Sequence, residues 1–452
     1  MENHYFWKNE KLMNLNFMKQ LLILIFFSFF LFSCKKSSQN SNVIASVPVV
    51  STSAVTDIIA TGASSGGNIS DDGGADITAR GVCWGTSNNP VVSGDHSTDG
   101  TGTGTFTSTI ANLSAGTTYY VRAYATNSAG TAYGNELSFT TNTPDVYVAG
   151  YEHTASGSNT IAKTWKNGIL TDLTDGSTQA YASCITASGS NVYAAGDIAG
   201  ILTLWQNGVP TALSSANTTK ATSIFSSGND VYISANETTS TPYTSIAKIY
   251  KNGVATPLND GTTYDIVTSL YVAGSDVYAA GEEASGSVYI AKFWKNGVAT
   301  NLTNGTYTAY ALSIFVSGND VYVVGVERDG GGVGNLTAKV WKNGVETSLS
   351  DGTHDVDVEG ISVSGNDVYV AGIDYSTGIG VITLWKNGVP TNITDGTNDA
   401  YANSLYILGN DVYIAGWEKN GSYYVAKFWK NGVSTSLTSG SQNGYAYGIF
   451  CK

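Results

Sequence analysis

Two short phrases alternate along most of the chain and constrain its fold more than any other feature. The first contains Trp-Lys-Asn-Gly, as in AKFWKNGVAT over residues 291–300. The second begins with Asp-Val-Tyr, as in DVYVVG over residues 320–325. After Pro144 each phrase occurs seven times, with small substitutions, at intervals of about 44 residues. A regular period of this length indicates an array of equivalent structural units.

Each unit divides into four short β-strands. In one repeat we expect strands over residues 310–316, 320–327, 336–342 and 345–350. Gly-Asn or Gly-Ser separates the first two strands and suits a type II′ turn, whereas Asn-Gly separates the last two and is a strong type I′ signal. Four-stranded antiparallel units at this period are typical of the blades of a β-propeller.

The two ends of the array predict how the ring closes. The array begins at Asp145 with a strand of the second type, and it ends over residues 445–451 with a strand of the first type. We therefore predict a seven-bladed β-propeller over residues 145–452, in which strand 445–451 completes the first blade. Because a Trp, or Tyr250 in one unit, recurs at this position of the repeated phrase, we expect it to pack between blades. Lys292 should lay its stem over Trp294 as it reaches water.

Variation in spacing predicts which face of the propeller is free for recognition. From the Gly of the Asp-Val-Tyr phrase to the next Trp or Tyr, the spacing varies between 9 and 16 residues. The spacing from that Trp or Tyr to the Asp-Val-Tyr phrase of the next unit is nearly constant. The variable loop lies between the second and third strands, and variable loops on a rigid scaffold commonly carry binding sites. An acidic residue is expected to open this loop in every unit, at Glu152, Asp197, Glu237, Glu283, Glu327, Asp374 and Glu418.

Aromatic residues accompany these acids on the same face. The connections between units carry Asp-Gly-Thr-like turns followed in four units by Tyr181, Tyr310, Tyr401 and Tyr445. Such a rim suits a polyol or sugar, a cation or a basic peptide. Alternatively, the acids accept hydrogen bonds from loop backbones and the tyrosines pack between blades. Residues that break the repeat pattern are better candidates for a single specific site; they are His153, Arg328, Asp329, Asp357 and Glu359.

The remaining chemistry is sparse. A net charge of −13 and a pI near 4.6 argue against nucleic acid as a partner, since phosphate binding needs a basic face. The four His are scattered, and we expect no metal site, no cofactor and no catalytic group, hence no enzyme activity. Cys83, Cys184 and Cys451 show no metal-ligand spacing, and a Cys184–Cys451 pair is left open.

The N-terminus reads as a targeting segment. From Met18, which is a candidate true start, the chain shows a Lys, an apolar run and then Leu-Phe-Ser-Cys at residues 31–34. This segment resembles a bacterial lipoprotein signal, which implies removal of residues 1–33 and lipidation of Cys34. Residues 34–43 then form a lipidated tether. Lys35 stands where the resemblance links Asp to inner-membrane retention, so an outer-membrane anchor is expected.

Residues 44–141 show short alternating strands separated by Gly, Asn and Asp turns. The segment LSAGTTYYVRAYATNSAGTAYG is similar to part of fibronectin type III domains, with Leu113, Thr117 and Tyr119 at the family's Leu…Gly-Thr-x-Tyr positions. The family's strand-B Trp is absent. The resemblance implies a β-sandwich with Tyr119 as the tyrosine corner. The phrase AKVWKNG is similar to the end of the third strand in WD-repeat blades and implies architecture only.

Together these features predict an all-β chain with a fibronectin type III-like β-sandwich followed by a seven-bladed β-propeller. The combination looks like envelope lipoproteins of Bacteroidetes-type bacteria. We expect a membrane-anchored binding or adhesion protein in the cell envelope, with a glycan, polymer or protein ligand on the variable-loop face. The alternatives are a carbohydrate-active enzyme, either a glycoside hydrolase or a lyase, with acids at the central opening, and a periplasmic protein–protein scaffold.

Overall fold

The computed structural model describes residues 44–215, 218–238, 244–328 and 334–452. The expected signal segment, the tether with Cys34, and Asp329 all lie outside these ranges. Within the described ranges every regular element is a β-strand, and no helix long and apolar enough to cross a membrane is found there.

Two four-stranded antiparallel sheets form the N-terminal part. One contains β1 (Val49–Thr52), β2 (Thr56–Ile59), β3 (Gly62–Asp71) and β5 (Gly104–Ile110). The other contains β4 (Ala79–Gly85), β6 (Thr118–Asn127), β7 (Gly130–Tyr133) and β8 (Leu137–Thr140). Ile110 from the first sheet and Val82, Val121 and Phe139 from the second belong to one buried cluster, so the two sheets share a core.

Seven further sheets follow, each with four antiparallel strands. The first contains β36 (Gly444–Cys451), β9 (Val146–His153), β10 (Thr160–Lys166) and β11 (Ile169–Asp172). The second contains β12 (Ala180–Ser188), β13 (Asn191–Ile198), β14 (Ile201–Gln206) and β15 (Val209–Ala212). The third contains β16 (Thr219–Ser227), β17 (Asp230–Thr238), β18 (Ser245–Lys251) and β19 (Val254–Pro257).

The other four sheets repeat this order. The fourth contains β20 (Asp265–Ala273), β21 (Asp276–Ser285), β22 (Val288–Lys295) and β23 (Val298–Asn301). The fifth contains β24 (Thr308–Ser317), β25 (Asp320–Arg328), β26 (Leu336–Lys342) and β27 (Val345–Ser348). The sixth contains β28 (Val356–Ser364), β29 (Asp367–Asp374), β30 (Val381–Lys386) and β31 (Val389–Asn392). The seventh contains β32 (Ala400–Leu408), β33 (Asp411–Asn420), β34 (Tyr423–Lys430) and β35 (Val433–Ser436).

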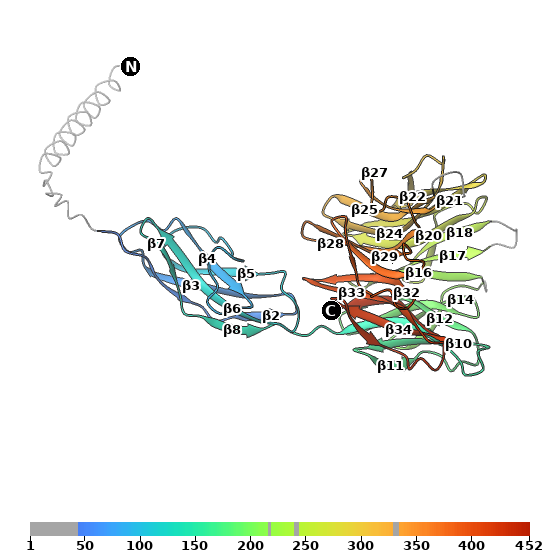
Figure 1. Ribbon diagram of the computed structural model, residues 1–452, viewed down its shortest axis with the longest axis horizontal. Helices are drawn as coiled ribbons and strands as arrows, with labels where there is room; N and C mark the ends of the chain where they lie inside the picture. The colour runs from blue at the N-terminus through green and yellow to red at the C-terminus, as the bar shows by residue number, and fades with distance from the viewer. Residues whose placement is uncertain (1–43, 216–217, 239–243, 329–333) are drawn as a thin grey trace, which may run out of the picture.

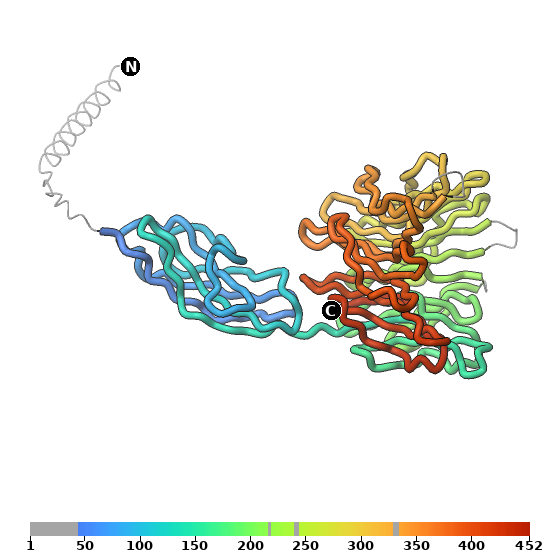
Figure 2. Tube along the Cα trace, viewed as in Figure 1, coloured from blue at the N-terminus to red at the C-terminus, as the bar shows by residue number. Residues whose placement is uncertain are grey.

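The seven sheets are arranged in a closed order that is consistent with the blades of a β-propeller (Figure 2). The first strand of each sheet contacts the first strands of both neighbours, from β12 through β16, β20, β24, β28 and β32 to β36 and back to β12. The last strand of the chain, β36, pairs with β9 from Cys451 opposite Val146 to Gly444 opposite Glu152. The predicted seven units, with the last strand completing the first sheet, are therefore confirmed.

The aromatic residue of the repeated phrase packs between neighbouring sheets, as predicted. Trp294 is 1% exposed and lies in one cluster with Tyr232 and Ile249 of the preceding sheet. The equivalent residues are also buried, at Trp165, Trp205, Tyr250, Trp341, Trp385 and Trp429. The following Asn and Gly both have positive φ, for example 51° at Asn296 and 81° at Gly297, which is the conformation of a type I′ turn.

Side-chain contacts explain why the two repeated phrases occur together. Oδ1 of Asn296 accepts the Val277 N–H at 2.9 Å, and its Nδ2 donates to Asp276 at 2.8 Å. Lys295 pairs with the same carboxylate at 2.8 Å and lies 5.2 Å above the ring of Tyr278. The corresponding Lys–Asp pair is present in six of the seven sheets. These contacts fix the hairpins on one face, here called the uniform face.

The N-terminal part docks on this uniform face. The backbone N–H of Ala115 donates to Oδ2 of Asp411 at 3.1 Å. A Cβ on Gly409, in the β32–β33 turn, would lie 2.2 Å from the carbonyl oxygen of Leu113. The opposite variable-loop face, at the ends of β17 and β18, points away from the N-terminal sheets (Figure 1).

The described cysteines are free and buried. Cys184 lies in the cluster between the second and third sheets, and Cys451 lies in the cluster between the seventh and first sheets. The disulfide left open by the sequence is therefore not formed.

Candidate ligand-binding face

The predicted acids do not open the variable loops but lie within the last residues of the second strands. Glu152 is in β9, Glu283 in β21 and Asp374 at the end of β29, and the others occupy β13, β17, β25 and β33. The strands extend further than the sequence suggested because each of these residues still pairs with the third strand.

Five of the acids form ion pairs with a Lys of the third strand, two residues before the repeated aromatic residue. Glu152 lies 3.3 Å from Lys163, and Glu327 lies 3.5 Å from Lys339. The other three pairs are Glu237–Lys248, Glu283–Lys292 and Glu418–Lys427. A pair shared by five sheets favours a role in the blade rather than in one ligand site.

The contact of Lys292 with Trp294 was predicted from the sequence, but its ion pair was not. Its Nζ lies 5.7 Å from the centre of the Trp294 ring, as expected. The ammonium group, however, is buried and pairs with Glu283 instead of reaching water. A buried ammonium needs a counter-charge, so the acid at this position stabilises the blade.

The second and sixth sheets lack this Lys, and the acids at their predicted positions have other partners. Thr203 and Thr383 replace it, and both are buried. Asp197 lies one residue earlier than the other acids, is itself buried and accepts the Gly200 N–H at 3.1 Å. Burial raises the pKa of the Asp197 carboxyl. Asp374 contacts Nε2 of His354 at 3.2 Å.

Aromatic side chains gather on one side of the variable-loop face. The Trp417 ring stacks on that of Tyr401, with centroids 5.2 Å apart and an interplanar angle of 11°. Trp417 also contacts Tyr424 and Tyr445, and Tyr445 contacts Tyr151 at 5.0 Å. We call the connected set the aromatic cluster; it comprises Tyr151, Tyr181, Tyr401, Trp417, Tyr424, Tyr445 and Tyr447.

The aromatic cluster belongs to the seventh, first and second sheets alone. It brings together three of the four predicted tyrosines, with His153 beside Tyr151 and Tyr445 at 6.1 and 6.3 Å. Tyr310 lies elsewhere, 5.4 Å from Tyr289. The candidate Arg328 donates to the Gly334 carbonyl at 2.8 Å, within its own loop.

The residues predicted from the sequence did not include four members of the aromatic cluster: Tyr151, Trp417, Tyr424 and Tyr447. Tyr151 and Trp417 directly follow the Gly that ends the repeated Asp-Val-Tyr phrase, a position held by Val326 and Ile373 in two other repeats. Comparing this column of the repeats would have revealed the aromatic pair.

Asp357 and Glu359 lie next to the aromatic cluster, on β28. The hydroxyl of Tyr401 donates to Oδ2 of Asp357 at 3.5 Å. Burial raises the pKa of the Asp357 carboxyl, and burial together with the charge of Asp357 raises that of Glu359. Among the described residues, no ion pair includes either carboxylate, unlike most acids of this face.

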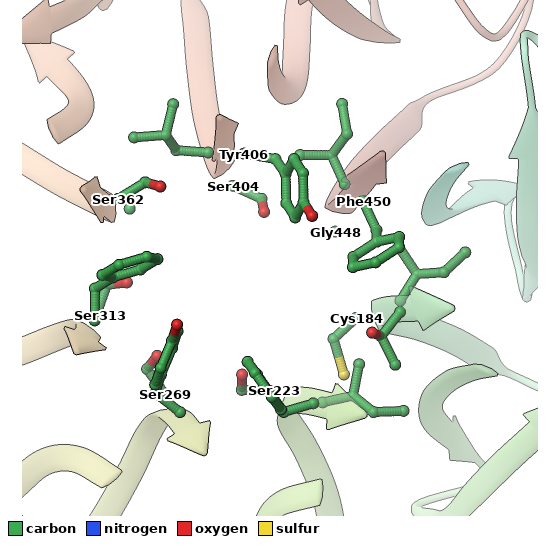
Figure 3. A pocket seen from close by; sticks show the side chains of 18 of the residues that line it. Cys184, Ser223, Ser269, Ser313, Ser362, Ser404, Tyr406, Gly448 and Phe450 are labelled. Atoms are coloured by element: carbon green, nitrogen blue, oxygen red, sulfur yellow. The ribbon is translucent and has the colours of Figure 1, made fainter. Parts of the chain in front are cut away.

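A central channel of about 820 Å³ opens between the first strands of the seven sheets (Figure 3). Serine hydroxyls and aromatic rings line it. The rings come from Phe225, Tyr271, Phe315, Tyr406, Tyr447 and Phe450. Glu359 is the one charged residue among its described lining. This volume lies within the range of ordinary small-molecule sites.

A second pair of buried acids, Glu282 and Asp265, lies in the fourth sheet. Glu282 is 6% exposed, and its Oε2 has no hydrogen-bond partner among the described residues. Burial and the charge of Asp265 raise the pKa of Glu282 to about 8. The sequence analysis did not identify this residue. Its position is apolar in several repeats, so an acid there is a break in the pattern.

Within the described ranges, no group of three or more His, Cys, Asp and Glu side chains is placed to hold a metal ion. The expected absence of a metal and of a cofactor stays a prediction.

No family model matches the sequence, and no curated protein sequence matches it. Among solved structures, TolB from Acinetobacter baumannii is similar at 10% identity with a TM-score of 0.39, over 61% of this chain and 76% of that chain. The acylaminoacyl peptidase of Pyrococcus horikoshii is similar at 10% identity with a TM-score of 0.43, over 71% of this chain and 50% of that chain. A prolyl endopeptidase is similar at 12% identity with a TM-score of 0.41, over 73% and 48%. At these scores the likeness is one of fold only, and this chain spans about half the length of the two peptidases.

Proposed function

We propose that this protein is a cell-envelope binding protein that takes a carbohydrate on the variable-loop face of a seven-bladed propeller. The observation that carries the proposal is the aromatic cluster, which joins seven rings over three neighbouring sheets, whereas in the fourth and fifth sheets only Tyr264, Tyr289 and Tyr310 form a comparable set. A feature needed by every blade would recur in every blade. Aromatic rings on one side of the ring instead suit a single ligand with apolar faces and polar edges, as sugars have.

The geometry of the pairs also supports this role. Tyr401 lies directly opposite Trp417 on neighbouring strands, and Tyr445 lies directly opposite Tyr151. Cross-strand pairing holds each ring in place before any ligand arrives, so little conformational entropy is lost on binding. All four side chains are half-buried and keep part of their surface exposed.

The N-terminal part fits the role of a stalk. We propose that it is a fibronectin type III-like sandwich, because the Tyr119 hydroxyl accepts the Ser114 N–H at 3.0 Å, the bond expected of a tyrosine corner. It docks on the uniform face through Ala115 and Asp411. With a lipid at Cys34 in an outer membrane, this arrangement would turn the variable-loop face away from the anchor.

A glycan array probed with residues 44–452 tests the proposal. We expect binding that is lost in Trp417→Ala and kept in Trp294→Ala when signals are compared per folded molecule. Trp294 serves as the matched control because it is buried between sheets on the other side of the ring. An array without any bound glycan, or binding that survives Trp417→Ala, would contradict the proposal.

A carbohydrate-active enzyme is the second candidate, and Asp357 and Glu359 are the observation that favours it. Glycoside hydrolysis uses two neighbouring carboxyls, one protonated as the acid and one ionised as the base or nucleophile, and burial raises the pKa of both Asp357 and Glu359. A hydrolysis screen on the glycans that bind separates the candidates. Turnover that disappears in Glu359→Gln supports an enzyme, whereas binding without turnover supports a binding protein.

A further inference from the structure

The acids of the variable-loop face differ in whether a cation balances them. Glu152, Glu237, Glu283, Glu327 and Glu418 each pair with a Lys, and Asp374 contacts His354. Asp357 and Glu359 lie among tyrosines instead, and no Lys, Arg or His of the described ranges pairs with them. Beside the aromatic cluster, the variable-loop face therefore carries two carboxyls that no cation of the described residues balances.

Tyr401 connects this place to the aromatic cluster. One face of its ring stacks against Trp417, while its hydroxyl donates to Asp357. A ligand held against the cluster near Tyr401 would thus present its substituents to Asp357. Glu359, two residues further along β28, lines the channel, whose neighbouring walls carry the serine hydroxyls and aromatic rings shown in Figure 3.

Resting on the proposed function, we propose that the ligand is a carbohydrate that bears a free primary amine. Its sugar rings lie on the aromatic cluster, and one ammonium group enters the mouth of the channel beside Asp357 and Glu359. The hydroxyls of the channel serve the remaining polar groups of the sugar.

An organic ammonium fits this site better than a metal ion does. Two carboxylates are too few for the six to eight oxygen ligands that Ca²⁺ prefers. Aromatic rings, in contrast, attract organic cations through their faces. An ammonium also offers three donors, which two carboxylates can accept together. The overall charge of −13 favours the approach of a cationic polymer.

Binding of the ammonium is coupled to a proton. The titratable groups that interact with the two acids are Asp355 on the same segment, Tyr375 after β29 and Tyr401 on β32. All are acids or phenols, so no neighbouring cation offsets the burial that raises the pKa of both carboxyls. An arriving ammonium favours the ionised form, so we expect a proton held by these carboxyls to be released to solvent.

Calorimetry with two matched probes tests the proposal: a glucosamine tetramer and an N-acetylglucosamine tetramer, at about pH 6, where the free amines are protonated. Residues 44–452 should bind the free amine at least tenfold more tightly than the acetylated probe. The double variant Asp357→Asn/Glu359→Gln should lose this preference. Asp351→Asn is the matched control, because it removes one exposed charge from the adjoining turn; it should change affinity less than twofold.

Proton release gives a readout that does not depend on how the double variant folds. Titration of the wild-type protein in two buffers of different ionisation enthalpy should show protons released with the amine probe and none with the acetylated probe. Equal affinity for the two probes, no binding of the amine probe, or no proton release would overturn the proposal. If a glycan without a free amine binds on the array and its binding depends on Trp417, the proposed carbohydrate binding stands although the amine-bearing ligand is wrong. If no glycan binds, both proposals are wrong.

Discussion

The backbone nitrogen of Ala115 lies 3.1 Å from Oδ2 of Asp411, and this hydrogen bond joins the N-terminal sheets to the seventh sheet of the propeller. Asp411 also accepts from Lys430 at 2.9 Å and from Asn431 at 2.8 Å. Its side chain is 2% exposed, compared with 35% for the equivalent Asp276. One residue of the repeat has therefore acquired a second role, in docking.

Asp411→Ala should loosen this docking. We expect a broader distance distribution between spin labels placed on the two parts, because a buried N–H loses its acceptor. The free energy of unfolding should fall by about 1–3 kcal/mol more than the loss of the blade-internal contacts alone explains. Asp320→Ala is the matched control, since Asp320 makes the same contacts to Lys342 and Asn343 but none to the N-terminal part. Equal broadening in both variants would show that Asp411 does not set the docking.

Trp294→Ala and Trp417→Ala should separate stability from binding. Removing the buried Trp294 ring leaves a cavity between sheets and should lower the free energy of unfolding by about 3–5 kcal/mol. Glycan affinity per folded molecule should stay unchanged. Trp417→Ala should abolish binding with a much smaller loss of stability, because its ring is half-buried. Differential scanning calorimetry and isothermal titration give the two quantities. Loss of binding at full stability in Trp294→Ala would show that the Trp of the repeated phrase contacts the ligand.

Glu282→Gln should make the protein more stable at alkaline pH. The folded state holds the Glu282 proton up to about pH 8, whereas an unfolded chain releases it near the ordinary value. Between these values the folded state binds more protons, so the Glu282 contribution to stability falls as pH rises. The upper bound of this loss is about 5 kcal/mol.

The Gln variant should remove this part of the pH dependence. Urea unfolding from about pH 5 to pH 8 measures it, with Glu283→Gln as the neighbouring control, since Glu283 is paired to Lys292. An unchanged slope in Glu282→Gln would mean that its carboxyl ionises normally.

The thiols of Cys83, Cys184 and Cys451 should be inert in the folded protein. All three are buried, and burial raises the pKa of each, to about 11 for Cys83 and about 12 for Cys184. A thiolate is the reactive form, so a thiol reagent at neutral pH should label residues 44–452 only after denaturation. Three labelled thiols are expected in denaturant without reductant. Recovery of only one would indicate that two of them had formed a disulfide.

Most of the architecture could be predicted from the repeats in the sequence. The period, the Asn-Gly turns and the mismatch between the first and last strand types predicted seven four-stranded sheets and the strand that completes the first. These features are local or periodic, so a single chain displays them. The burial of Trp294 followed from the same reasoning.

The candidate site was only partly predictable, because its contacts join strands and sheets. The pairing of Glu283 with Lys292 depends on register between two strands. A signal was nevertheless present, since the two repeats that replace this Lys with Thr203 and Thr383 also have an unusual acid, buried in one and beside His354 in the other. Asp357 and Glu359 were noticed as breaks in the pattern. Their contact with Tyr401 and the docking of Ala115 on Asp411 required the structure.

The pairing of β36 with β9 has a consequence for how the protein is made. Because the final strand belongs to the first sheet, the ring stays open at one seam until β36 has left the ribosome. Until then the edge of β9 has no partner strand with which to pair. A chaperone that shields nascent β-edges should therefore be retained on this protein until β36 has emerged, and deletion of residues 444–451 should prolong that association.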